Sequence, residues 1–174
     1  MRTSRTIRAL TTSAALALAL GGFAASPAFA DGTPHGGHIL LNARLVGSMP
    51  APDSPAVAGI NPGAAPWVNG PSRVRVRDNG NITVQIRGLV IPPPRGTGVN
   101  PIASVVATLV CDQQVAASTT PFALSTAGDG STHDVIAVPR HCDDPVVLIQ
   151  PAANRAVYIA STTADKRSHA EHDD

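Results

Sequence analysis

The histidines are the residues of this sequence whose type and spacing most directly suggest chemistry. Four of the six form two His-x-x-His pairs near the ends of the chain, His35 with His38 and His169 with His172. Neutral imidazole is a common ligand of zinc and copper, and carboxylates near the second pair could complete a coordination shell. The spacing therefore indicates a candidate zinc or copper site. Solvated polar tails are the alternative, because this spacing acquires ligand geometry only on a helix or a fixed turn.

Catalytic side chains are harder to place. His133 lies beside Asp134, and His141 lies close to Asp143, so that either histidine could activate a nearby serine. The sequence lacks the Gly-x-Ser-x-Gly elbow, the His-Glu-x-x-His run and the glycine-rich phosphate loop that mark common catalytic sites. We therefore predict that the protein is not an enzyme and assign no catalytic residue.

The first thirty residues have the features of a secretory signal peptide. A basic start precedes an apolar run over residues 14–20, and small residues at Ala28 and Ala30 suit the signal peptidase pocket. The basic residues are Arg2, Arg5 and Arg8. Because the apolar run is too short to span a bilayer as a helix, we expect cleavage after Ala30. The product is then a secreted, extracellular protein with no membrane insertion.

The cysteines point to a structural disulfide. Cys111 and Cys142 are the only two in the chain, so their pairing is forced if they are oxidised. In an exported protein such a pair persists as a disulfide, whereas a metal-binding or catalytic thiol pair is the alternative. The closed loop is expected to stabilise the fold by about 3 to 4 kcal/mol in the chain-entropy model.

Length and composition bound the organisation of the exported part, which is long enough for one domain and too short for two. We expect a flexible segment over residues 31–38, a β domain over 39–163 and a disordered, charged tail over 164–174. Ten basic residues against twelve acidic ones after position 30 give a formal charge of about −2. This balance and the scarcity of aromatic side chains argue against a nucleic-acid partner.

The exported part has the pattern of an all-β protein. Short segments in which Val, Ile and Leu alternate with polar residues recur between clusters of Pro, Gly, Asn and Asp. We expect a two-sheet sandwich of the Ig-like or Greek-key kind with about eight strands, and a short β-barrel is the alternative. The expected strands cover residues 39–46, 73–77, 82–87, 102–111, 122–126, 134–138, 146–150 and 155–161.

The clearest local prediction is a β-hairpin over residues 73–87. A two-residue Asn-Gly turn would mix apolar and polar side chains on each face, since directly opposed residues point the same way. We therefore expect a three-residue loop over residues 79–81, or a bulge, which places Val76 opposite Val84 and buries both.

Two features are candidate binding residues for an unknown protein or cell-surface ligand. On the polar face of the hairpin, Arg73, Arg75, Arg77 and Arg87 either meet an anionic partner or keep the sheet soluble. The second feature is Trp67, in the proline-rich connection over residues 47–72. Its side chain serves either as a binding anchor or as a plug over the core.

Several segments together resemble known secreted proteins. They are Ala43-Arg44-Leu45-Val46-Gly47-Ser48-Met49-Pro50, Ala56-Val57-Ala58-Gly59, Gly88-Leu89 at the end of the hairpin, and residues 103–111 with Cys142. On these segments the chain resembles small secreted β proteins of unknown function from high-GC bacteria, and its first half resembles a chordin-type (CHRD) domain. The segment 92–96 stands where a CHRD domain carries a histidine-containing segment, so the resemblance implies neither a ligand nor an activity.

These observations favour a secreted, non-catalytic β-sandwich protein that acts as an interaction or structural module through loops and surfaces. Extracellular metal binding by the terminal histidines is the alternative function, and an uncharacterised hydrolase is the third. No cofactor is expected apart from zinc or copper in the alternative.

Overall fold

The structure is a computed structural model that describes residues 36–162, all of which belong to one compact unit. This range contains strands and turns but no helix, which confirms the all-β prediction and leaves no helix able to cross a membrane. The longer strands are β1 (Ile39–Gly47), β3 (Ser72–Arg77), β4 (Asn81–Ile86), β5 (Ser104–Cys111), β6 (Gln114–Ser118), β8 (Gly130–Val135) and β9 (Val146–Pro151). The two-residue strands are β2 (Asn61–Pro62), β7 (Phe122–Ala123), β10 (Val157–Tyr158) and β11 (Ala160–Ser161). The predicted signal peptide and charged tail lie outside the described residues.

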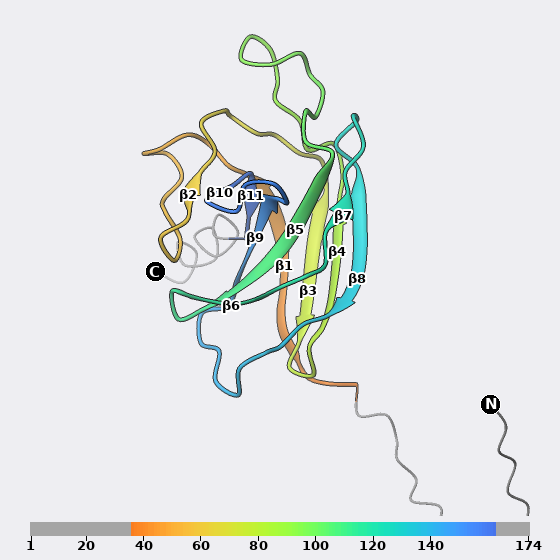
Figure 1. Ribbon diagram of the computed structural model, residues 1–174. Helices are drawn as coiled ribbons and strands as arrows, with labels where there is room; N and C mark the ends of the chain where they lie inside the picture. The colour runs from red at the N-terminus through yellow and green to blue at the C-terminus, as the bar shows by residue number, and fades with distance from the viewer. Residues whose placement is uncertain (1–35, 163–174) are drawn as a thin grey trace, which may run out of the picture. The chain divides into compact units, whose positions relative to one another are not determined.

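One antiparallel sheet of nine strands curls into a half-barrel (Figure 1). Neighbouring strands follow the order β6-β5-β9-β11-β1-β3-β4-β8, and β7 pairs with β5. β1 joins the two halves of this sheet, because its residues up to Leu45 pair with β3 whereas Val46 and Gly47 pair with β11. Hydrogen bonding is thus continuous where a sandwich would have a break, and the two separate sheets of the expected sandwich are not confirmed.

β3 and β4 form the predicted hairpin, with a register that differs from the expected one by two residues. Val76 lies opposite Ile82 rather than Val84, and the loop covers residues 78–80. Gly80 adopts a φ of 89°, and a glycine in this left-handed region closes a three-residue loop. A shift of two residues keeps every side chain on its predicted face, so the apolar and polar faces are correct.

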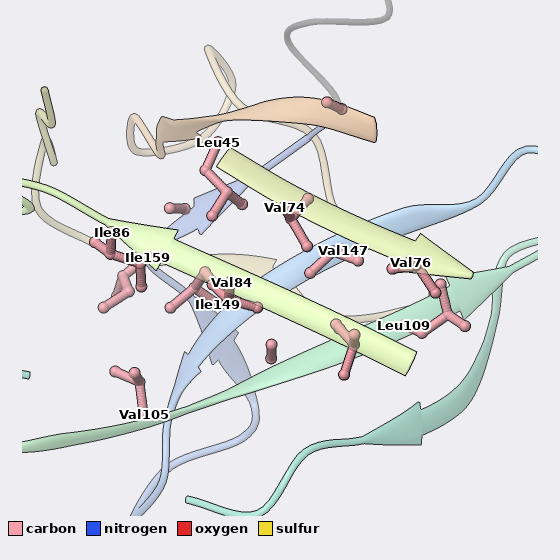
Figure 2. Packing of buried hydrophobic residues seen from close by; sticks show 14 of the residues in the cluster. Leu45, Val74, Val76, Val84, Ile86, Val105, Leu109, Val147, Ile149 and Ile159 are labelled. Atoms are coloured by element: carbon pink, nitrogen blue, oxygen red, sulfur yellow. The ribbon is translucent and has the colours of Figure 1, made fainter. Parts of the chain in front are cut away.

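The core lies between the two halves of the curled sheet, where side chains from β3 and β4 meet those from β5 and β9 (Figure 2). Its fully buried members include Val74, Val76, Ile82, Val84, Ile86, Val105, Leu109, Val147 and Ile149. Burying a side chain of this size stabilises a fold by roughly 1.5–3 kcal/mol. The alternation of valine and arginine along β3 therefore fixes which face of the strand points inward.

β5 and β9 are buried on both faces. A second apolar cluster covers their outer surface, and its members are Val57, Val110, Val146, Leu148 and Tyr158. The proline-rich connection over residues 47–72 supplies part of this cover, because Val57 is buried and the Tyr158 hydroxyl donates a hydrogen bond to the Pro55 carbonyl at 2.6 Å. The connection is therefore packed against the sheet.

Strand β6 is absent from the predicted set. It follows β5 through Asp112 and Gln113, whose φ angles of 51° and 61° are those of a turn that usually contains Asn-Gly. This turn contains no glycine, and the sequence therefore does not indicate the strand that follows it. Two other predicted strands differ from the observed ones. β8 ends at Val135, before most of the predicted strand 134–138, and only the two residues of β7 form a strand within the predicted range 122–126.

The predicted disulfide is confirmed. Cys111 at the end of β5 is joined to Cys142 in the connection between β8 and β9, with a Cα–Cα distance of 4.8 Å. Cys111 is buried, and no cysteine in the described range is free. Buried disulfides of this kind are characteristic of proteins in oxidising compartments outside the cytoplasm, which agrees with the expected export.

Candidate binding face

The outer face of β1, β3 and β4 is the candidate functional site. Side chains alternate along a strand, so the residues between the buried valines point away from the core. Arg73 and Arg75 on β3 are exposed in this way, and so are Arg44 on β1 and Arg87 just after β4. The face is therefore basic even though residues 31–174 together carry a slight negative charge.

Strand pairing brings these arginines together. Arg44 lies directly opposite Arg73, and Arg73 lies directly opposite Gln85 on the next strand. Directly opposed residues of an antiparallel pair have Cβ atoms about 4.5–5.5 Å apart. The side chains of Arg44 and Arg73 are therefore neighbours on the sheet, and they concentrate positive charge at its outer surface.

A depression of about 680 Å³ opens at this place. Arg44, Arg73 and Arg87 line it, together with Gln85 and Asn69. Arginine offers a planar fork of N–H donors that binds a carboxylate or a phosphate through two parallel hydrogen bonds. Three such side chains around one depression have the donor chemistry to bind an anion.

Asn69 builds one wall of the depression. Its Oδ1 accepts a hydrogen bond from the Gly47 backbone N–H at 2.6 Å, and its Nδ2 donates to the carbonyls of Leu45 at 2.9 Å and Gly70 at 2.7 Å. These bonds tie the end of the proline-rich connection to β1 at the position where β1 leaves β3 and begins to pair with β11. The split between the strands is thereby held open by one side chain.

The opposite wall is held by Ser72 and Gly70. The Arg87 backbone N–H donates to Ser72 Oγ at 2.9 Å, and the Gly70 N–H donates to the Arg87 carbonyl at 2.8 Å. Arg87 follows the last residue of β4, yet its backbone is fixed on both sides of the peptide unit. The backbone position from which the Arg87 side chain projects is therefore fixed.

A smaller hollow of about 170 Å³ continues the depression along β3. It is lined by Arg75 and Thr83, and it shares Arg73 and Gln85 with the larger depression. Within residues 36–162, no carboxylate forms an ion pair with the guanidinium of Arg73 or Arg75. Both side chains are exposed, and the two hollows that they line follow β3 and are together called the groove.

Asp134 on β8, next to β4, does not neutralise this face. Its carboxylate accepts hydrogen bonds from the Thr120 backbone N–H at 2.7 Å, the Thr120 hydroxyl at 3.0 Å and the Val135 N–H at 2.8 Å. The Thr120 N–H is the main cause that lowers the pKa of Asp134 below its ordinary value, and the Val135 N–H acts in the same direction. This carboxylate therefore serves to bind the segment before β7 to β8.

Two of the predicted binding residues do not lie on the open face. Trp67 is only 5% exposed and belongs to the main core cluster, so the plug interpretation is correct and the anchor interpretation is wrong. Arg77 is half-buried, and its Nη1 donates to the Gly37 carbonyl at 2.6 Å. Arg73 and Arg75 are the predicted residues that the structure brings into the groove.

The predicted metal ligands fall mostly beyond the part of the chain that the structure describes. His35, His169 and His172 lie outside it, and His38 is exposed. Among residues 36–162, no three His, Cys, Asp or Glu side chains are grouped as a metal site would require. His133 and Asp134 do not act together either, because His133 Nδ1 is hydrogen-bonded to Thr83 Oγ1 at 3.1 Å.

Sequence reasoning did not assign Arg44, Asn69 and Gln85 to a site. Arg44 carried a usable signal, since it alternates with apolar residues in the predicted strand 39–46. The pairing of that strand with the hairpin was the missing information. Asn69 stands among prolines and glycines, and nothing in its sequence surroundings indicates that its side chain binds the backbone of β1.

Comparison with protein-family models, with curated proteins and with solved structures gives no match. The function is therefore argued from the geometry of the groove and from the targeting and redox features of the sequence.

Proposed function

We propose that the protein is an exported, non-catalytic binding module that recognises an anionic ligand through the outer face of β1, β3 and β4. The observation that carries this proposal is the convergence of Arg44, Arg73 and Arg87 on one depression. The signal-peptide pattern and the buried disulfide support an extracellular place of action. The two halves of the curled sheet would provide a rigid scaffold for this face, in place of the two separate sheets of the expected sandwich.

The rigidity of the face favours binding. Arg44 and Arg73 project from strands whose opposite faces are packed in the core, so the backbone beneath them does not need to be ordered when a ligand arrives. Gln85 adds an amide group to the lining, whereas the Asn69 amide is engaged by the backbone. An anion would thus meet charged donors from the arginines and a neutral donor from Gln85.

The competing interpretation is that the arginines only keep the sheet soluble. A solvating face usually mixes positive and negative side chains, since opposite charges across strands stabilise the pair and like charges destabilise it. Here Arg44 stands directly opposite Arg73, and Arg87 lines the same depression. That distribution favours a face adapted to an external anion.

The proposal is tested by titrating the isotopically labelled mature protein with inorganic phosphate, diphosphate and citrate and by following its backbone amide signals. We expect shifts in the signals of residues 44–46, 69–73 and 85–87, which surround the depression. Replacing Arg73 by Gln should weaken binding at least tenfold, as loss of a charge-assisted hydrogen bond does.

The matched control is Arg140→Gln, because Arg140 is an exposed arginine in the connection between β8 and β9 and does not line the depression. It should bind each anion as the unaltered protein does. Shifts that are spread over the whole surface, or equal losses in the two variants, would contradict the proposal.

A further inference from the structure

We infer that the ligand is a linear polymer carrying phosphate groups, which lies in an extended conformation along β3. This inference rests on the proposed anion-binding function and adds the class of ligand. It is carried by the continuity of the two hollows, which share Arg73 and Gln85 and extend in the direction of the strand.

The spacing of the arginines sets the repeat of the polymer. Arg73 and Arg75 lie two residues apart on the same face of β3, which separates their Cα atoms by about 7 Å. A small anion placed in the larger depression would leave Arg75 without a share in binding. A chain with successive anionic groups would contact both arginines, and each further contact would add to its affinity without a new cost of association.

Phosphate fits the larger depression better than carboxylate does. A carboxylate has two oxygens and is saturated by one or two guanidinium groups, whereas a phosphate group presents more acceptor oxygens in a tetrahedral arrangement. Three arginines line this depression. A phosphate group there can accept hydrogen bonds from several guanidinium groups at once.

Neutral polar side chains suit the linkers between the anionic groups. Thr83 and Gln85 stand opposite Arg75 and Arg73 across the hairpin, and Asn42 stands opposite Arg75 on the other side. Hydroxyl and amide groups in these positions can exchange hydrogen bonds with the linking units of a polymer. Arg75 thus has a neutral polar side chain on each side, whereas Arg73 has Arg44 on one side and Gln85 on the other.

Nucleic acid is a less suitable polymer for this face. Proteins that bind single strands stack bases on exposed aromatic side chains. The aromatic residues of the described range are Trp67, Phe122 and Tyr158, and all three are buried. A polymer whose repeating unit needs no ring stacking is favoured.

The inference is tested with polyphosphate chains of increasing length, from diphosphate to chains longer than the groove, by calorimetry on the mature protein. We expect affinity to rise at least tenfold with length until the chain spans both hollows, and then to level off. Arg75→Gln should remove most of this gain, and it should weaken diphosphate binding much less than Arg73→Gln does, because Arg75 does not line the larger depression. Arg73→Gln should weaken the binding of every length, and Arg140→Gln of none.

The outcomes separate the two proposals. If no anion binds, the proposed function fails. If diphosphate binds but Arg75→Gln leaves the affinity for long chains unchanged, the proposed function stands and the polymer inference is overturned. Poly-glutamate of matched length that binds as tightly as polyphosphate would overturn the preference for phosphate, and tighter binding of single-stranded DNA would overturn the choice of polymer. Unchanged melting temperatures confirm that each variant is folded.

Discussion

At the scale of single residues, Asn69 has the most consequence for the candidate site. Its amide bonds to the Gly47 N–H and the Leu45 carbonyl at the point where β1 changes partners, and Leu45 lines the depression together with Asn69 itself. A backbone group that loses its partner costs more than the net value of the hydrogen bond. The depression therefore depends on a residue that carries no charge.

We expect Asn69→Ala to lower the free energy of unfolding by about 1–3 kcal/mol, because three backbone groups lose a hydrogen bond. The same variant should weaken diphosphate binding, since the wall of the depression is no longer fixed. Urea unfolding and calorimetry measure the two effects. Asn42→Ala is the control, as Asn42 is exposed on the same face and no hydrogen bond of its side chain would be lost. Equal stability of the two variants would show that Asn69 has no bridging role.

Asp134 gives a prediction on pH. Its hydrogen bonds favour the ionised carboxylate and hold its pKa below the ordinary value of 3.8. Its contribution to stability is therefore complete above that ordinary value and is lost as the pH falls through the lower pKa of the folded state. Thermal unfolding of the mature protein over an acidic pH series should show a steeper loss of stability than Asp134→Asn shows. Parallel curves would assign the acid sensitivity to other groups.

At the scale of elements, how well a strand can be predicted from the sequence depends on how many of its faces are exposed to solvent. β1, β3 and β4 each have one buried and one solvent-exposed face. The alternation of apolar and polar residues therefore predicts the bounds of these strands almost to the residue. β5 and β9 are buried on both faces, so the sequence indicated strands there but not the second apolar cluster that covers them. β6 follows a turn of Asp112 and Gln113 without glycine, which leaves no local signal.

The hairpin of β3 and β4 allows a test of which strand face is buried. Val84 on β4 is fully buried, and we expect Val84→Asp to unfold the domain because it places an unpaired charge in the core. Thr83→Asp is the matched control, since Thr83 is the preceding residue and is exposed on the opposite face. Circular dichroism should show a folded control and an unfolded Val84 variant. A normal melting temperature for the latter would mean that the face assignment is wrong.

At the scale of the whole molecule, the strand order makes the site. Arg44 and Arg73 are separated by the long proline-rich connection, and they meet because the residues of β1 up to Leu45 pair with β3. The alternation along the hairpin predicted a row of arginines on one face. The pairing of β1 with β3 depends on the whole core, and the residues of the hairpin alone do not indicate it. The depression could therefore be described only after the topology was known.

The disulfide acts at this scale too, because it joins β5 in one half of the sheet to the connection that follows β8 in the other. We expect mass spectrometry of the purified protein without reductant to show Cys111 linked to Cys142. Replacing both cysteines by alanine should lower the free energy of unfolding by about 3–4 kcal/mol, since the closed loop restricts the unfolded chain.

The same double variant should bind diphosphate as the unaltered protein does, because neither cysteine lines the depression. Calorimetry below the lowered melting temperature measures this. Two free thiols in the secreted protein would contradict the structural role of the pair. Loss of binding in a folded double variant would instead show that the disulfide supports the arginine face through the core, because Cys111 belongs to the same buried cluster as Val74 and Val76.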